Sequence, residues 1–294
     1  MCDAFIIEGV IMLYKAENDF FTLAVKEMGA ELNSLKSKKT GIEYIWFGDE
    51  KIWYGQSPIL FPIIGRLLDD KYILNGIEYS MEKHGIVRKK PFKLIENTED
   101  SLTFVQTDDE DSIKAYPYQF ELKVTFQLTE NGLKVSHIIT NNSKETMYYS
   151  FGAHPGFNCE IGDYLEFSDD TKLFTERIDT ESILIDEKFP VEMIDNKIEL
   201  TKTIFDKDAL ILSNFKSKNI KIKSNNHNRI ISFDFDSPFL GIWAKPDAPY
   251  VCIEPWWGVN DDYNKKADFS QKRGIMSLLP DESKEFLWEV SISE

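Results

Sequence analysis

The sequence predicts an all-β protein, built as a large antiparallel sandwich or barrel. Apolar and polar residues alternate over many short segments. These segments recur about every 8–12 residues with turn residues between them, and long helical patterns are nearly absent. The 294 residues are 42% hydrophobic and 13% aromatic, which suffices for a sizeable core and excludes general disorder. Because no linker, repeat or low-complexity tract divides the chain, we expect residues 1–294 to form a single domain.

The clearest strand pair is expected between residues 120 and 139. Apolar and polar residues alternate from Phe120 to Leu128 and again from Leu133 to Ile139, with Asn131-Gly132 between the two runs. Asn-Gly readily adopts the positive φ angles of a tight reversal, so the pattern predicts a hairpin. His137 lies on the apolar face of the second run, where we expect a buried structural histidine.

Further strands are expected wherever β-branched and aromatic residues alternate with polar ones. In chain order these are residues 20–25, 43–47, 71–74, 77–81, 92–95, 102–106, 164–167, 209–212, 220–223, 230–235, 239–244, 250–254 and 286–292. A second pair, Asn75-Gly76, predicts a turn between two of them. Helix is expected only around residues 265–271 and as one turn within residues 53–60, and the acidic run 108–111 is expected to be a solvated loop.

Composition limits the possible partners. The chain has 34 Lys+Arg and 50 Asp+Glu, and its net charge of −16 repels phosphate backbones, which argues against nucleic acid. No stretch reaches the ~20 apolar residues of a membrane span. The apolar run at residues 5–13 lacks the basic start and cleavage site of a signal peptide, and Met12 is a second candidate start that would make residues 1–11 an extension.

Cysteine usage favours a cytoplasmic protein. The cysteines are odd in number and widely spaced, with no CxxC pair, so they predict neither a disulfide framework nor a zinc site: Cys2, Cys159 and Cys252. Motifs for zinc, dinucleotides, phosphate loops and a nucleophilic serine are also absent from the sequence. We therefore expect no metal and no cofactor.

Two histidines stand where the strand pattern breaks. His154 lies in a segment, residues 151–158, that mixes aromatic residues with Gly and Pro, and His84 is followed by Gly85. Such local departures from pattern are typical of functional sites. His227, in contrast, lies in a polar turn and is expected to be exposed.

One carboxylate stands out beside aromatic residues. Glu254 ends an apolar run, Pro255 is expected to end the strand there, and Trp256 and Trp257 follow. Two indoles beside an acid would form an apolar wall with a hydrogen-bonding edge, a combination that suits sugars. The alternative is that both tryptophans belong to the core and that Glu254 is merely solvated. Imidazole and carboxylate next to aromatic rings suit proton transfer without a cofactor.

Two other charged residues are candidates for the same site. Arg66 follows the apolar run 61–65, where its charged side chain needs an ionic or hydrogen-bonding partner. Asp208 precedes an expected strand, and Asp206 competes with it for the same role.

Short motifs recur in a specific order along the chain: Gly29-Ala30-Glu31-Leu32, residues 61–66, residues 84–88, residues 153–157, residues 208–210 and residues 253–256. Together they resemble the aldose 1-epimerase (galactose mutarotase) family, in particular its shorter bacterial branch associated with lactose or galactose genes. The resemblance runs from Met12 to the end of the chain. It implies a large antiparallel β-sandwich, called a supersandwich, with a sugar site on a concave sheet face.

The resemblance also implies roles for individual residues. His154 matches the general acid and Glu254 the general base of the family. Arg66, His84, Asp208 and Trp256 match positions that hold the sugar. The implied reaction interconverts the α and β anomers of a hexose by opening and reclosing its ring. We expect the protein to be a monomer or a weak dimer.

Alternatives for substrate and activity stay open. His154 is followed by Pro-Gly-Phe rather than the Pro-Tyr-Phe of free-galactose enzymes, which leaves the identity of the sugar open. The cluster Lys83, Arg88, Lys89 and Lys90 would suit a hexose phosphate, although a free hexose and a solvated basic edge are favoured. A sugar-binding or sugar-sensing protein without catalysis is the main alternative. A glycoside hydrolase would need Asp208 to act with Glu254.

Overall fold

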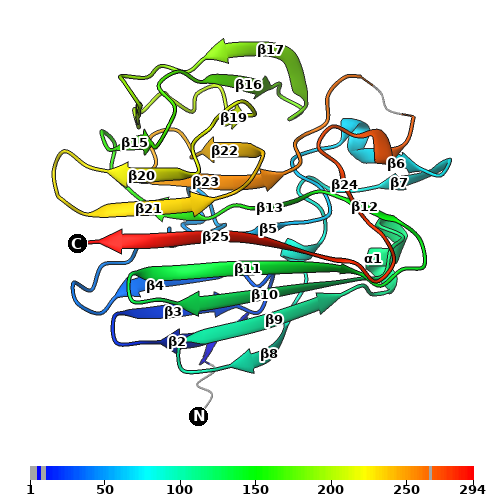
Figure 1. Ribbon diagram of the computed structural model, residues 1–294, viewed down its shortest axis with the longest axis horizontal. Helices are drawn as coiled ribbons and strands as arrows, with labels where there is room; N and C mark the ends of the chain where they lie inside the picture. The colour runs from blue at the N-terminus through cyan, green and yellow to red at the C-terminus, as the bar shows by residue number, and fades with distance from the viewer. Residues whose placement is uncertain (1–4, 8–10, 265–266) are drawn as a thin grey trace.

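The structure is a computed structural model that describes residues 5–7, 11–264 and 267–294. Strands dominate it and pair in antiparallel fashion within each sheet, so the predicted all-β sandwich is confirmed (Figure 1). One nine-stranded sheet forms the first layer, in the order β18 (Lys197–Glu199), β15 (Tyr164–Phe167), β20 (Asn219–Lys223), β21 (Ile230–Phe235), β25 (Ser283–Ser293), β11 (Gly132–Asn141), β10 (Phe120–Leu128), β9 (Ser101–Thr107) and β8 (Lys93–Asn97).

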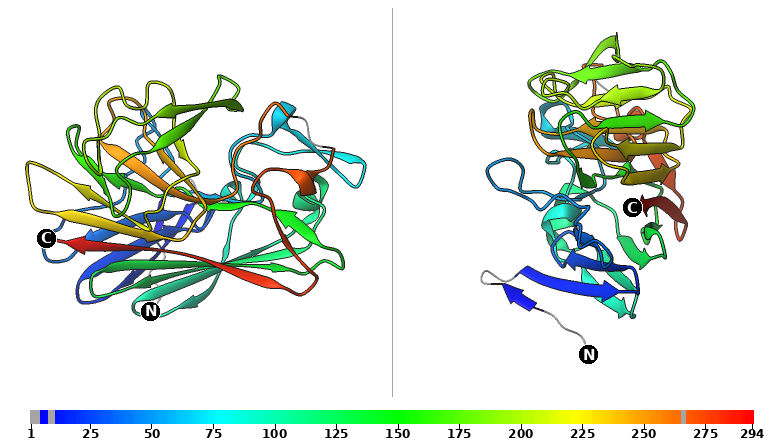
Figure 2. Two further views of the ribbon diagram at one scale, coloured as in Figure 1. Left: turned by 45° about the horizontal axis from the view of Figure 1, so that its top comes forward. Right: turned by 90° about the vertical axis from the view of Figure 1, so that its left-hand side faces the viewer.

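Two sheets share the second layer. An eight-stranded sheet has the order β17 (Leu184–Pro190), β16 (Phe174–Ile178), β19 (Leu210–Leu212), β22 (Phe239–Trp243), β23 (Tyr250–Trp257), β13 (Phe151–Ala153) and β5 (Ile59–Leu60), and β14 (Gly156–Asn158) also pairs with β23. A four-stranded sheet contains β1 (Phe5–Ile7), β2 (Ile11–Glu17), β3 (Phe21–Lys26) and β4 (Leu32–Ser37). Figure 2 shows the N-terminal strands at one end of the molecule and β16 and β17 at the other.

Short elements complete the fold. Two-stranded sheets join β6 (Lys71–Leu74) to β7 (Ile77–Ser80) and β12 (Met147–Tyr149) to β24 (Met276–Leu278). The helical segments are α1 (Glu110–Ala115) and the 3₁₀ turns η1 (Leu68–Asp70), η2 (Val87–Lys89) and η3 (Phe269–Gln271). Within the described ranges, none of the helices combines the length and apolar character needed to cross a membrane.

Aromatic contacts hold the two layers together. Phe286 on β25 stacks on Phe151 of β13, with ring centroids 4.7 Å apart. At the N-terminal end, Tyr14 on β2 meets Phe104 on β9 edge to face at 5.5 Å. The nine-stranded sheet therefore covers both sheets of the second layer, and the main core lies between the layers.

The expected hairpin at residues 120–139 is confirmed, but its turn works differently from the expectation. β10 and β11 pair up to Leu128 and Leu133, and Asn131 is not among the residues with positive φ. Gly132 is needed for close approach instead, since a Cβ there would lie 2.1 Å from the carbonyl oxygen of Val290. The positive φ angles expected of Asn-Gly occur at the other pair, Asn75-Gly76, between β6 and β7.

Expectations of strand and helix fail where side chains replace backbone pairing. Residues 43–47 form only isolated bridges, because the Glu43 carboxylate accepts the backbone N–H groups of Leu35 and Ile45, at 2.8 and 3.0 Å. The acidic run 108–111 is a loop only in its first half, since Asp108 and Asp109 precede α1 whereas Glu110 and Asp111 belong to it. Asp109 caps α1 in a capping box with Ser112, so these acids begin a helix.

Of the two expected short helices, the one at residues 53–60 is wrong and the one at residues 265–271 is confirmed only in its last three residues. Residues 53–60 contain no helical turn and end in β5. In residues 265–271 only the 3₁₀ turn η3 occurs, and residues 265 and 266 lie outside the described residues.

Pro255 does not end its strand as expected. β23 continues through it to Trp257, and Pro255 pairs with Leu240 on β22. Ile253 donates its backbone N–H to Pro155, in the link between β13 and β14. The nitrogen of Pro255 lies two residues further on and faces the same side, where the pairing of β13 with β23 has ended at Gly152, so the missing N–H costs the ladder little.

Candidate active site

The alternation of side chains along β23 separates a core face from a site face. Trp257 packs on Phe286 in the core between the layers, with ring centroids 4.9 Å apart. Cys252, Glu254 and Trp256 therefore point away from the nine-stranded sheet. The two tryptophans expected to form one wall lie on opposite faces of the strand, and only Trp256 shares a face with Glu254.

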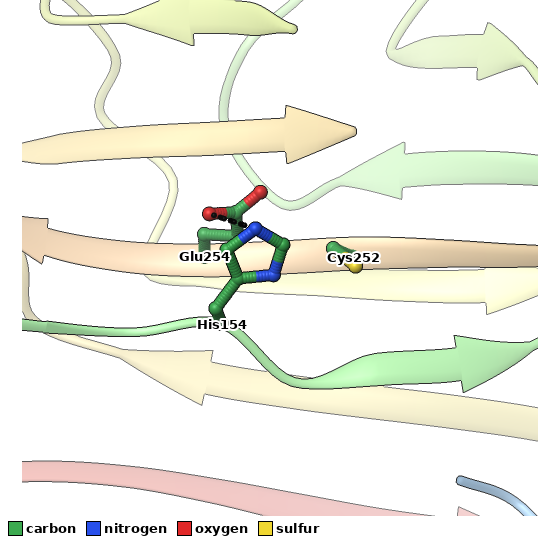
Figure 3. Close-up of side chains that lie close together, drawn as sticks. All are labelled: His154, Cys252 and Glu254. Atoms are coloured by element: carbon green, nitrogen blue, oxygen red, sulfur yellow. Dashed lines mark ion pairs between the residues drawn. The ribbon is translucent and has the colours of Figure 1, made fainter. Parts of the chain in front are cut away.

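A break in the neighbouring strand brings His154 to Glu254. β13 pairs with β23 through Phe151 and Gly152, and β14 resumes pairing at Gly156. His154 lies in the link between these strands and turns its imidazole over β23. Its Nε2 lies 3.1 Å from Oε2 of Glu254, as Figure 3 shows.

The site contains buried polar atoms that no described residue satisfies. His154 is 8% exposed and Glu254 only 1%. Apart from the 3.1 Å contact between His154 and Glu254, no hydrogen bond of normal geometry reaches Nδ1 of His154, the carboxyl oxygens of Glu254 or the indole nitrogen of Trp256 in the described part of the chain. Each such atom costs about 1–3 kcal/mol when water is excluded, so their concentration in one place indicates a ligand site.

Burial determines the protonation of the pair. It raises the pKa of Glu254 well above its usual value, against the opposing effects of the Trp256 indole and the Lys83 ammonium. Burial also lowers the pKa of His154 to about 3, and the charges of Lys83 and Arg88 lower it further. Burial thus favours the uncharged form of each group, a protonated carboxyl at Glu254 and a neutral imidazole at His154. The expectation that nearby carboxylates keep His154 charged is wrong for this state, because desolvation outweighs them.

Aromatic rings surround His154. The ring of Trp53 lies 5.1 Å from the imidazole, and Trp243 meets it edge-on at 5.8 Å. His84 lies 6.0 Å away, also edge-on. Sequence reasoning missed Trp53 and Trp243, because only the fold brings these two distant positions to His154.

Comparison with known proteins agrees with this geometry. Residues 12–292 match the family model described as aldose 1-epimerase. The chain belongs to the aldose 1-epimerase family.

Relatives and solved structures cover nearly the whole chain. The plasmid and chromosomal forms of Protein LacX from Lactococcus lactis subsp. lactis are each 31% identical over 96% of this chain and 99% of their own. A galactose mutarotase-like protein from Lactobacillus casei superposes with a TM-score of 0.91 at 29% identity, covering 96% of this chain and all of its own. A galactose mutarotase related enzyme from Lactobacillus acidophilus gives 0.91 at 30% identity, with 96% and 98% covered.

His84 stands next to the pair in this member of the aldose 1-epimerase family. It adopts a positive φ of 66°, and its Nδ1 accepts the backbone N–H of Gly65 at 3.2 Å. Gly85 follows because a Cβ there would lie 2.1 Å from the carbonyl oxygen of Phe61. Burial lowers the pKa of His84 well below its usual value, and His154 lowers it further, so we assign a neutral imidazole.

Arg66 turns its guanidinium towards carboxylates. Its Nε and Nη2 donate to Asp70, each at 2.7 Å, and its Nη1 donates to Glu181 at 2.8 Å. The preceding residue, Gly65, is hydrogen-bonded to His84, but the structure shows no contact between Arg66 and the His154–Glu254 pair.

Asp208 influences the site through its charge. It is exposed, with a φ of 67°, and its charge raises the pKa of both Glu254 and Lys83. Asp206 instead lines a cavity of about 880 Å³ that also contains Tyr164 and Phe189. That cavity does not include His154 or Glu254, so its large volume does not identify it as the candidate active site.

Proposed function

We propose that this protein is an aldose 1-epimerase that interconverts the α and β anomers of a hexose. The observation that carries the proposal is the buried contact of 3.1 Å between His154 Nε2 and Glu254 Oε2, with polar atoms of both side chains unpartnered. Family membership supports a sugar epimerase, and the pair supplies groups of the right kind for proton transfer.

Ring opening requires that the sugar lose one proton and gain another. Opening the pyranose requires a base at the C1 hydroxyl and an acid at the ring oxygen, and reclosure on the other face of the aldehyde inverts C1. A pair that holds one proton provides one acid and one base. The groups exchange roles when the ring recloses, so no external proton is consumed.

Two tautomers of the pair contain the same single proton. In the free site burial favours the proton on Glu254, whereas the family resemblance assigns the acid role to His154. Sugar hydroxyls that donate to the Glu254 carboxylate would stabilise the ionised tautomer, with the proton on His154. Substrate binding would thus convert the resting pair into the assigned one.

Anomer exchange in variants tests this function. His154→Asn and Glu254→Gln should each slow mutarotation by about 10²–10⁴-fold, the usual contribution of a positioned acid or base. Polarimetry on freshly dissolved sugars measures the rate, and His227→Asn is the matched control outside the site. An unchanged rate in either variant removes that residue from the mechanism. Sugar binding by calorimetry without faster exchange in the wild type would select the non-catalytic, sugar-binding alternative.

The proposed substrate is a free hexose, with a hexose phosphate as the second candidate. Of the basic cluster, Lys89 pairs with Glu82 and Lys90 with Asp109, as expected of a solvated edge. Lys83 and Arg88 have no carboxylate within ion-pair distance among the described residues, and both act on the pKa of His154. These two cations are the observation that favours an anionic group on the sugar.

Exchange NMR on free and 6-phosphorylated hexoses distinguishes the two substrates. If the free sugar is the substrate, Lys83→Met changes its kcat/KM little. If the phosphate is the substrate, the same change raises KM for the phosphorylated sugar by at least about tenfold, since a charged hydrogen bond contributes about 1.5–3 kcal/mol. Lys89→Met is the matched control, because its ammonium already pairs with Glu82.

A further inference from the structure

We propose that His154, Cys252 and Glu254 bind a soft divalent cation of the zinc class, and that this cation blocks the acid–base pair. Metal binding stands on the geometry alone. Only the blocking of turnover rests on the proposed epimerase function.

The three side chains converge on one point. One ligand atom from each, the imidazole nitrogen, the thiol sulfur and a carboxyl oxygen, lies within 4.8 Å of the others, and all three residues are buried. Figure 3 shows Cys252 and Glu254 on β23 with the His154 ring over them. Zinc bonds of about 2.0–2.3 Å hold tetrahedral ligand atoms about 3.3–3.8 Å apart, so side-chain movements of about 1 Å complete the set.

The kinds of atoms select the metal. Imidazole and thiolate ligands favour zinc and similar ions over magnesium and calcium, which prefer oxygen. The only contact between these groups that a metal would replace is the 3.1 Å contact of His154 Nε2 with Glu254 Oε2, and Nδ1 of His154 has no hydrogen-bond partner among the described residues. Three protein ligands leave one position of a tetrahedral ion for solvent.

The charge balance also permits binding, although Lys83 and Arg88 are near. When the thiol and the carboxyl group are both protonated, the ion replaces two protons: one bond forms to Cys252 Sγ as its S–H proton leaves, and one to Glu254 as its carboxyl proton leaves. His154 binds through the lone pair of a neutral imidazole. Two positive charges enter and two leave, so the buried site has the same net charge before and after.

Occupied in this way, the site cannot shuttle protons. The metal holds both groups that the proposed ring opening needs, so metal and sugar compete. An enzyme carrying the ion is therefore inactive until the ion is removed.

Cobalt is the probe, because a thiolate ligand gives Co²⁺ a charge-transfer band in the near ultraviolet. Full-length protein freed of metal with a chelator should bind one equivalent of Co²⁺ with this band, and Zn²⁺ should displace it. Cys252→Ser should abolish the band and weaken Zn²⁺ binding by more than the roughly 10–100-fold that loss of an outer-shell partner costs. Cys159→Ser, at the other free cysteine of the described residues, should leave both unchanged.

Turnover gives the second readout. Zn²⁺ should inhibit mutarotation by wild type, whereas Cys252→Ser should resist Zn²⁺ when its rate with the ion is compared with its own metal-free rate. Cys252→Ala replaces Cys252→Ser if the hydroxyl destabilises the buried site. Absence of metal binding, or a thiolate band that survives in both Cys252 variants, overturns the inference. If wild type lacks mutarotase activity but still binds metal through Cys252, the proposed function fails and the metal site stands.

Discussion

The indole of Trp256 lies against Gly241 on the neighbouring strand, so closely that a Cβ on residue 241 would lie 2.6 Å from its Cζ2 atom. On the other side, a Cβ on Gly152 would lie 2.8 Å from Cδ1 of the same indole. Two glycines on the strands flanking β23 thus make room for one large side chain next to Glu254. The position of Trp256 depends on them.

Gly241→Ala should therefore disturb both stability and turnover. The added methyl group must displace the indole, and overpacking of this kind costs about 1–3 kcal/mol. We expect a lower denaturation midpoint and slower anomer exchange, measured by urea unfolding and polarimetry. In a Trp256→Phe background the same change should cost less, because the smaller ring leaves space. Equal losses in both backgrounds would show that the indole is not what residue 241 accommodates.

The pH dependence of kcat/KM should lack an inflection near pH 6.5. Burial lowers the pKa of His154 to about 3 and raises that of Glu254 well above its usual value, so the free pair keeps one proton between these limits. The rate should fall towards pH 3, when His154 gains a second proton, and at alkaline pH, when the last proton leaves. An inflection near 6.5 that disappears in His154→Asn would mean that this imidazole titrates as if exposed to water.

His137→Gln should change stability more than turnover. His137 is 1% exposed, and its ring lies 4.9 Å from that of Phe151 in the core, as expected from its place on β11. Loss of these ring contacts should cost about 1–3 kcal/mol in urea unfolding at pH 8. Normal melting with lost turnover would contradict a structural role.

Acid should reduce the difference between His137→Gln and wild type. Burial lowers the pKa of His137 to about 3. The unfolded chain gains its proton near pH 6.5, so wild type loses stability as the pH falls from 6.5 towards 3. Glutamine cannot take up that proton, and the two unfolding free energies should converge over this range. A constant difference would show that His137 is not held neutral.

Asp70→Asn tests whether sugar binding depends on the orientation in which Asp70 holds the Arg66 guanidinium. The Asp70 carboxylate accepts both Nε and Nη2 of this guanidinium, and an amide can accept only one of them. If Arg66 holds the sugar, KM should rise several-fold while kcat changes less than about twofold. Glu78→Gln, which removes the exposed pair with Lys71, is the control. Unchanged KM in Asp70→Asn would exclude a sugar contact that depends on this alignment.

Periodicity along the chain was sufficient for the strands because a half-buried strand has an apolar face of its own. β10 and β15 have the predicted bounds, and His137 is buried as its place in the alternation requires. Expectations failed where the deciding partner lies elsewhere in the chain. The Glu43 carboxylate replaces a ladder, and Pro255 is tolerated because β13 ends beside it.

The sequence by itself determined that this chain is an all-β member of its family. It also identified His154 and Glu254 as the candidate catalytic residues, since both interrupt local patterns. Only the tertiary structure decided that their side chains meet at 3.1 Å, that Trp53 and Trp243 adjoin them, and that Trp257 does not. It also decided the direction in which the pKa values of His154 and Glu254 shift. A pKa depends on how much water and charge surround a group, and those surroundings come from strands far apart in the chain.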